Sequence, residues 1–241
     1  MEVISLSWWP HRPSLLLKFP NATILLDCAI DMNSIASFLP YSVINSSSAI
    51  WVKNAASVHP KKSVPQTQDL VRIGDCFFVD ALPEFQTVSL EEISKISIDV
   101  ILVSNWMSLM ALPFITEKTN FQGAIYATDP IVQFGRLVIE EFLDMMERVD
   151  RAPSDGQWKA NEIHGSFANR PSTDPTTWRQ FYSKAEMENS LSKIINVYFR
   201  ETMVINGIIK VTAHSSGFSI GSANWTIQTE SDRVSAVIIV C

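Results

Sequence analysis

Basic residues are scarce in this 241-residue chain, and they do not gather into a dense patch. Lysine and arginine total 19 against 25 acidic residues, which gives a formal net charge of -6, and the densest basic pair is Lys61-Lys62. Direct binding of RNA or DNA requires a basic face, because neutralising phosphates supplies much of the affinity. The composition therefore argues against phosphate binding by this segment alone.

Cysteine is also rare, and no segment resembles a targeting signal or a membrane span. Cys28, Cys76 and Cys241 form neither a CxxC pair nor an even disulfide set, as expected of a reducing compartment. The N-terminus carries Glu2 and lacks the basic and apolar regions of a signal peptide. No apolar run reaches the roughly 18 residues that a span requires. We expect no membrane partner.

What the chain does contain is apolar sequence in short, strand-like runs. Hydrophobic residues make up 46% and charged residues 18%, which is typical of one large domain with a well-buried interior. The continuous apolar runs Ile98–Val103 and Gly123–Ala127 predict strands buried on both faces. The polar stretch Ser42–Asp75 predicts a long surface loop, and Arg151–Pro175 predicts another. Further strands are predicted at Val3–Leu6, Leu15–Phe19, Thr23–Cys28, Cys76–Val79, Met203–Ile205, Ile208–Val211, Ser222–Thr229 and Val234–Val240.

Helix signals lie between these strands, and a tight turn lies near the end. Leu109–Lys118 predicts a short helix, and Asp129-Pro130 provides the N-cap and first residue of a longer one. A capping box at Ser183–Glu186 starts a third, and Asn206-Gly207 predicts a hairpin turn. The apolar stripe expected in the long helix is Ile131, Phe134, Val138, Phe142, Met145 and Val149, and in the third helix Met187, Leu191, Ile194 and Ile195. Together the pattern predicts an α/β layered domain with two packed sheets and helices outside.

One motif has the form of a catalytic signature. Gly217–Gly221 reads GxSxG around Ser219, but a nucleophile elbow needs a following helix and a later histidine. A strand is predicted next, and no histidine follows His214, so we expect a glycine-rich turn between strands. The four histidines lack the spacing that brings two imidazoles to one metal; they are His11, His59, His164 and His214.

Carboxylates near strand ends are a second possibility. Asp27 ends an apolar strand and Asp31 follows in the turn, a placement that suits catalysis and turn formation equally. Sequence alone leaves the two roles of Asp27 open.

Several strings, in this order and spacing, resemble the metallo-β-lactamase/β-CASP family of RNA-processing proteins, in particular its Integrator branch, across residues 1 to 235. The strings are Thr23–Met32, Phe77–Phe85, Asp99–Asn105, Ala111–Glu117, Tyr126–Pro130, Gly135–Leu137 and Ser215–Trp225. The resemblance implies a metallo-β-lactamase-like αββα sandwich. It also implies that residues 1–241 are the N-terminal portion of a longer pattern, without the β-CASP and C-terminal dimerisation regions.

The resemblance further implies a site without metal ligands. Active members carry a His-x-His-x-Asp-His loop after the strand that matches Ile98–Val103, and it holds two zinc ions. Here that loop, about two residues shorter, contains no histidine or aspartate: Asn105 stands at the first ligand position, and Trp106, Met107 and Ser108 follow. Phe218 matches a further ligand histidine. Asp27 matches an aspartate that supports the metal loop from behind.

These implications define an expected function. The resemblance implies a pseudoenzyme with no cofactor: a nuclear scaffold that partners the catalytic Integrator endonuclease subunit and other Integrator subunits. The process implied for this scaffold is small nuclear RNA 3′-end processing and nascent-transcript cleavage. The chain itself would contact RNA only indirectly. The alternative is a hydrolase, either through unrecognised ligands such as His214, Asp27 and Asp129 or through Ser219. A secreted binding domain, suggested by three glycosylation sequons, is opposed by the missing signal peptide and the odd cysteine count.

Overall fold

The computed structural model describes residues 1–7, 13–32, 38, 70–73, 76–80, 85–151, 159–168, 170, 174, 181–229 and 233–236. The chain forms two compact units. The first comprises Met1–Asp31, Thr87–Leu143 and Tyr182–Cys241, and the second comprises Met32–Gln86 and Asp144–Phe181.

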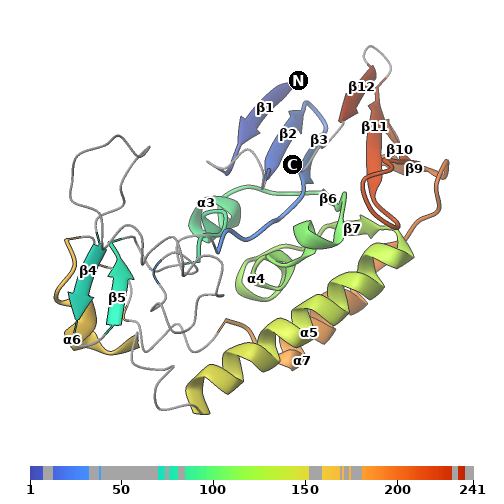
Figure 1. Cartoon of the computed structure of the whole chain (residues 1–241). Coiled ribbons are helices and arrows are strands. Elements are labelled where there is room, and N and C mark those ends of the chain that lie inside the picture. Colours follow the sequence, from blue (N-terminus) through green and yellow to red (C-terminus); the bar gives the residue numbers. More distant parts are fainter. Residues whose placement is uncertain are drawn as a thin grey trace, which may run out of the picture. The chain divides into compact units, whose positions relative to one another are not determined.

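A six-stranded sheet forms the centre of the first unit (Figure 1). Its order is β1-β2-β3-β6-β7-β8, and the bounds are β1 Glu2–Ser5, β2 Leu15–Phe19, β3 Ala22–Leu26, β6 Val100–Leu102, β7 Ala124–Ala127 and β8 Ile194–Asn196. β1, β2 and β3 pair antiparallel, whereas β3, β6, β7 and β8 run parallel. The carboxyl ends of four neighbouring strands therefore meet at one edge of the sheet.

A four-stranded antiparallel sheet packs against the first. Its order is β12-β11-β10-β9, with β9 Thr202–Ile205, β10 Ile209–Ser215, β11 Ala223–Gln228 and β12 Arg233–Ala236. The predicted hairpin turn is confirmed, because Asn206 and Gly207 between β9 and β10 both have positive φ, 49° and 73°. The core between the sheets joins Leu17, Ile24, Leu26, Val100 and Leu102 of the first sheet to Ile209, Val211, Ala213, Trp225 and Ile227 of the second.

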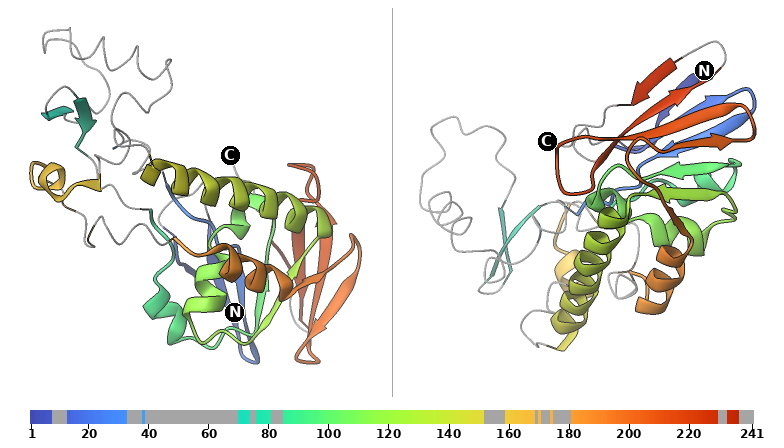
Figure 2. Two further views of the ribbon diagram at one scale, coloured as in Figure 1. Left: turned by 90° about the horizontal axis from the view of Figure 1, so that it is seen from below. Right: turned by 90° about the vertical axis from the view of Figure 1, so that its right-hand side faces the viewer.

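Helices lie on the other side of the first sheet, as the two further views show (Figure 2). They are α3 Leu90–Ser94, the 3-10 helix η1 Trp106–Leu109, α4 Leu112–Lys118, α5 Asp129–Arg151 and α7 Lys184–Ser192. Leu25, Ile101 and Ile125 are buried but take no part in the core between the sheets, so they point toward this helical layer. None of the described helices is long and apolar enough to cross a membrane.

Two helix predictions need correction. α7 has the expected capping box at Ser183 but ends at Ser192, and Ile194 and Ile195 belong to strand β8, where Ile195 is 49% exposed. Ile195 pairs with Tyr126 of the neighbouring strand β7, and this tertiary contact outweighs the helical spacing of the apolar residues.

The buried face of α5 is also different from the predicted stripe. Ile131 of that stripe is buried and Val138 and Phe142 are half-buried, but Phe134 is 40% exposed; the side chains of Met145 and Val149 lie outside the described residues. The buried positions in the described part of α5 are Ile131, Val132, Gly135 and Ile139. A Cβ on Gly135 would lie 2.8 Å from Cδ2 of Leu109, so glycine lets α5 approach η1 closely. The helix therefore turns this face inward and leaves Phe134 outward.

The second unit contains strands β4 Leu70–Ile73 and β5 Cys76–Val79, which pair antiparallel, and helix α6 Asn161–His164. Strand β4 corrects the prediction of a loop over Ser42–Asp75, while residues 42–69 lie outside the described residues. His164, expected in a loop, lies in α6; it is 5% exposed and its ring stacks on Phe38 with centroids 5.3 Å apart. His11, His59 and Cys241 lie outside the described residues.

Candidate functional site

Asp27 lies at the edge where the parallel strands end. It follows β3 directly, and its N–H donates to the carbonyl of Leu102 at the end of β6, over 3.0 Å. Its φ of 61° lies in the left-handed region, which aspartate adopts more readily than most residues. The side chain is fully buried, and its Oδ1 accepts the Ser104 N–H over 2.7 Å. Asp27 therefore ties β3 to the loop that follows β6.

The environment of this carboxyl disfavours its charge. Burial raises the pKa of Asp27 to about 7, and the Ser104 N–H, with the hydroxyls of Ser104 and Ser108, limits the rise. Oδ2 of Asp27 is buried and has no hydrogen-bond partner among the described residues. Near neutral pH the group is thus present in both protonated and charged forms.

The loop after β6 carries the positions that the family resemblance singled out. Asn105 is 2% exposed, and its Oδ1 accepts the Ser108 N–H over 3.0 Å, which makes it the N-cap of η1. Trp106 and Met107, the next two positions, are half-buried. The Asn105 oxygen is therefore used to start a helix.

Two residues that sequence reasoning missed hold this loop in place. Cys28 donates through its N–H and its Sγ to the Ser108 carbonyl, over 3.2 and 3.1 Å, and its own carbonyl accepts the Ala111 N–H over 2.9 Å. Tyr182 donates its hydroxyl to the Met110 carbonyl over 2.9 Å. No local sequence signal marks Tyr182, because its partner is 72 positions away in the chain.

The loop between β10 and β11 joins the same edge of the sheet. The Ala223 N–H donates to the Ser104 carbonyl over 2.8 Å, and the Thr128 hydroxyl donates to the Gly221 carbonyl over 2.6 Å. Gly221 has φ of 80°, and a Cβ there would lie 2.6 Å from Cβ of Pro130. Phe218, in the middle of this loop, is 46% exposed. The structure thus brings Asp27, the Ser104–Ser108 stretch and the Phe218 loop together.

These residue types do not fit a two-zinc site. Zinc takes thiolate, imidazole and carboxylate ligands, whereas the gathered side chains are an amide, two hydroxyls, a phenyl ring and one buried carboxyl. Across the described ranges no group of three or more histidine, cysteine, aspartate or glutamate residues is placed to hold a metal. Asp27, Asp129 and His214, the alternative ligands considered from sequence, are all described and form no such group.

Ser219 is not built as a nucleophile. Its loop joins two antiparallel strands, with positive φ at Gly217 and Gly221, and strand β11 follows at the place where a nucleophile elbow has a helix. The Ser219 N–H donates to Oγ of Ser222 over 2.8 Å, and the Ser222 hydroxyl donates to the Ser219 carbonyl over 2.7 Å, so Ser222 caps the turn. The prediction of a glycine-rich turn between strands is confirmed.

Comparison with known proteins agrees with this architecture. Residues 79–240 match the family model described as the metallo-beta-lactamase superfamily domain. The chain is 38% identical to Integrator complex subunit 9 of Xenopus laevis and 37% identical to that of Homo sapiens, over 98% of this chain and 36% of each relative. It is 25% identical to Endoribonuclease YSH1 of Yarrowia lipolytica, over 60% of this chain and 14% of that protein.

The comparisons confirm both the fold class and the family resemblance expected from sequence. The chain spans about a third of the length of the Integrator subunit 9 relatives it matches. The match to the family model covers well over half of the chain and includes β6, the loop after it and the Phe218 loop. The chain belongs to the metallo-β-lactamase superfamily.

Proposed function

We propose that this chain is a non-catalytic scaffold within an Integrator complex, where it partners the catalytic Integrator endonuclease subunit. The process it serves is small nuclear RNA 3′-end processing and nascent-transcript cleavage, in the nucleus. Similarity to Integrator complex subunit 9 over 98% of the chain supports membership of such a complex. The observation that carries the non-catalytic role is the use of the Asn105 side chain as the η1 cap.

Asn105 stands where active relatives of the family place their first zinc ligand. Its Oδ1 is engaged with the Ser108 N–H, and a neutral amide is not among the side chains with which zinc sites are built. At the position of a later ligand, Phe218 presents a hydrocarbon ring that cannot bind zinc. Without such ligands the site supplies neither a Lewis acid nor a metal-bound hydroxide.

The same residues serve well as a structural brace. Asp27 receives the Ser104 N–H, and the Ser104 carbonyl in turn receives the Ala223 N–H, so one short stretch links β3, β6 and β11. These bonds lie at the buried end of the sandwich, where each unmade backbone bond would cost about 1–3 kcal/mol. A rigid sandwich of this kind is suited to presenting a constant surface to a partner.

The charge balance supports an indirect relation to RNA. The net charge of -6 disfavours phosphate contact by this chain, so a partner subunit would supply the basic surface and the chemistry. The similarity to an endoribonuclease of Yarrowia lipolytica motivates the competing proposal of a hydrolase. The ligand-poor loop after β6 and the turn geometry around Ser219 oppose it.

A reconstitution experiment tests the proposal. The chain and the catalytic Integrator endonuclease subunit would be purified separately, mixed at micromolar concentrations, and analysed by size-exclusion chromatography and by cleavage of a small nuclear RNA precursor. We expect co-elution, and no cleavage by the chain alone with added zinc. Cleavage by the chain alone would overturn the non-catalytic role, and separate elution would overturn a partnership made through residues 1–241.

A further inference from the structure

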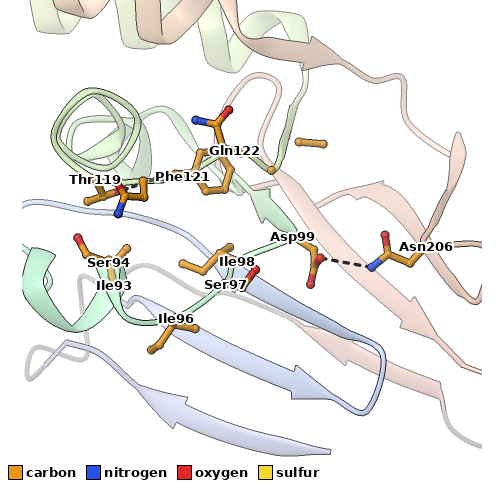
Figure 3. A pocket seen from close by; sticks show the side chains of 13 residues that line it. Ile93, Ser94, Ile96, Ser97, Ile98, Asp99, Thr119, Phe121, Gln122 and Asn206 are labelled. Carbon is orange, nitrogen blue, oxygen red and sulfur yellow. Dashed lines mark hydrogen bonds between the residues drawn. The ribbon is translucent and has the colours of Figure 1, made fainter.

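Two features of the first unit take no part in the proposed function: a cavity and a sheet edge. The cavity, of about 470 Å³, lies where β6 and β7 begin (Figure 3). Ile93 and Ile98 in its wall are nearly fully buried. Asp99, the one charged residue among the described lining residues, already accepts hydrogen bonds from the Thr23 N–H and the Asn206 amide. The cavity therefore offers a ligand no open apolar wall, and its carboxylate is engaged.

The sheet edge is strand β1, whose only neighbour among the described strands is β2 (Figure 1). The Leu6 N–H donates to the Ser14 carbonyl over 2.8 Å, which makes these two residues a hydrogen-bonded pair of the antiparallel ladder. Hydrogen-bonded and non-hydrogen-bonded pairs alternate along such a ladder. The even-numbered residues of β1 therefore direct their backbone N–H and C=O groups toward β2, whereas Val3 and Ser5 direct theirs toward the open edge.

Val3 also ends an apolar row of the sheet. It pairs with Leu17, Leu17 pairs with Ile24, and Ile24 pairs with Val100. The last three are buried in the core between the two sheets. Val3 lies on the same face, because directly paired side chains point to the same side of a sheet, but it is 53% exposed. An additional strand at this edge would cover Val3 and extend the row.

β1 lacks most of the features that protect natural sheet edges. Such edges carry lysine or proline, contain a bulge, or are very short. The four residues of β1 are Glu2, Val3, Ile4 and Ser5, and their register with β2 is continuous. Glu2 is the one charged residue among them. The strand is therefore open to pairing with a further strand, and Glu2 can select which one.

These features define the segment that fits the edge. The outward backbone groups of Val3 and Ser5 require an extended chain, as in recognition by strand addition. Aliphatic residues suit the positions opposite Val3 and the half-buried Ile4, and a basic residue suits the position opposite Glu2, because oppositely charged cross-strand pairs attract. A second copy of β1 fits less well, since pairing the two Val3 residues antiparallel would place Glu2 opposite Ile4.

We propose that the open edge of β1 binds an extended segment of a partner polypeptide, which adds a strand antiparallel to β1. The segment carries an aliphatic residue opposite Val3 and a lysine or arginine opposite Glu2. Its backbone exchanges hydrogen bonds with Val3 and Ser5, and its aliphatic side chain continues the row that begins at Val100 and runs through Leu17. This site is independent of the proposed scaffold role, so neither result below bears on that role.

Binding of short capped peptides tests the proposal. The probe is the acetylated, amidated pentapeptide Thr-Val-Val-Lys-Val, titrated into the full chain by isothermal calorimetry; its third residue lies opposite Val3 and its fourth opposite Glu2. Two N-methylated forms make a matched pair. Methylation of the third residue removes the N–H that donates to the Val3 carbonyl, whereas methylation of the fourth removes an N–H that points away from β1.

Variants of the chain give a second comparison. Val3→Lys places a charge on the edge strand, and Val204→Lys is its control, because Val204 lies on β9, the edge strand of the other sheet, and is 55% exposed. Val3→Pro removes the N–H that points to the open edge and leaves the hydrogen bonds between β1 and β2 in place. Circular dichroism establishes that each variant is folded.

We expect saturable binding that is at least about tenfold weaker when the third residue is methylated, and in Val3→Lys and Val3→Pro. Methylation of the fourth residue and Val204→Lys should change the affinity by less than about threefold. The absence of saturable binding to the folded wild-type chain would overturn the proposal. Equal affinity for the two methylated peptides would overturn it as well, and this comparison needs no variant of the chain. Homodimerisation that Val3→Lys abolishes would assign the edge to a second copy and overturn the choice of partner.

Discussion

Oδ1 of Asp27 accepts the backbone N–H of Ser104 over 2.7 Å, and this bond joins the end of β3 to the end of β6. The carboxyl is fully buried, and its residue holds a left-handed backbone conformation. A buried acid that makes one strong hydrogen bond, and that has no cationic partner among the residues the structure describes, is a group whose protonation is linked to folding.

Stability should fall as pH rises through the titration range of Asp27. Its folded pKa is raised to about 7 from a usual 3.8, so the folded chain holds a proton that the unfolded chain releases. The contribution is fully present below about pH 3.8 and is lost as pH rises through about 7, and the shift corresponds to at most about 4 kcal/mol. Asp27→Asn, which tolerates positive φ, should remove this part of the pH dependence. Urea unfolding of the wild-type chain and of Asp27→Asn, at pH 4.5 and pH 8, measures the change in unfolding free energy with pH. An equal change in the two proteins would contradict the linkage.

The two glycines of the Phe218 loop should respond differently to alanine. At Gly221, alanine combines a φ of 80° with a Cβ 2.6 Å from Pro130, and we expect a loss of about 2–4 kcal/mol. At Gly217, φ is 75° but a Cβ meets nothing within 4 Å, so the loss should be about 1 kcal/mol. Thermal unfolding of both variants gives the comparison. A Gly217→Ala variant as unstable as Gly221→Ala would show that the contact with α5 is unimportant.

The hydroxyl of Tyr182 should contribute measurably to stability. It is the hydrogen-bond partner of the buried Met110 carbonyl, so Tyr182→Phe should cost about 1–2 kcal/mol of unfolding free energy. Tyr198→Phe is the matched control, because Tyr198 is 80% exposed, and it should change stability by less than about 0.5 kcal/mol. Chemical denaturation separates the two; indistinguishable midpoints would argue against the Tyr182 bond.

The capping box of α7 makes a further prediction. The Ser183 hydroxyl accepts the Glu186 N–H, and the Glu186 carboxylate accepts the Ser183 N–H. A hydrogen bond from Lys118 and one from the Ser183 backbone lower the pKa of Glu186 to about 2. Ser183→Ala should cost about 1 kcal/mol, whereas Ser192→Ala, an exposed change at the other end of the helix, should cost less than about 0.5 kcal/mol. Similar losses at the two ends would contradict the cap.

Much of the fold follows from local signals in the sequence. Strands such as β2 and β5 lie where their apolar runs predict them, and the Asn206-Gly207 turn forms because only such residues accept its backbone conformation cheaply. The sequence-based predictions are wrong where tertiary contacts determine which element a residue joins or which way its side chain faces. Ile195 continues a helical spacing but pairs with β7, and Phe134 fits the apolar stripe but lies outward because Gly135 faces η1.

The candidate site could be predicted only in part. Asp27, Asn105 and Phe218 can be singled out through family resemblance, since their significance depends on what active relatives carry at those positions. Their hydrogen bonds cannot be read from sequence, because the partner of Asp27 is 77 positions away. The roles of Cys28 and Tyr182 likewise depend on backbone carbonyls, which any sequence presents equally. The residue types of the site can therefore be predicted from the sequence, whereas the hydrogen bonds between them require the structure.

Zinc content tests the non-catalytic proposal most directly. The full chain would be equilibrated with excess zinc, desalted and assayed by elemental analysis, with circular dichroism to establish that it is folded. Because a genuine site of this kind should fill under these conditions, we predict less than about one zinc per ten folded chains. One or two zinc ions per folded chain would contradict the proposal and would direct attention to His214, Asp27 and Asp129 as ligands.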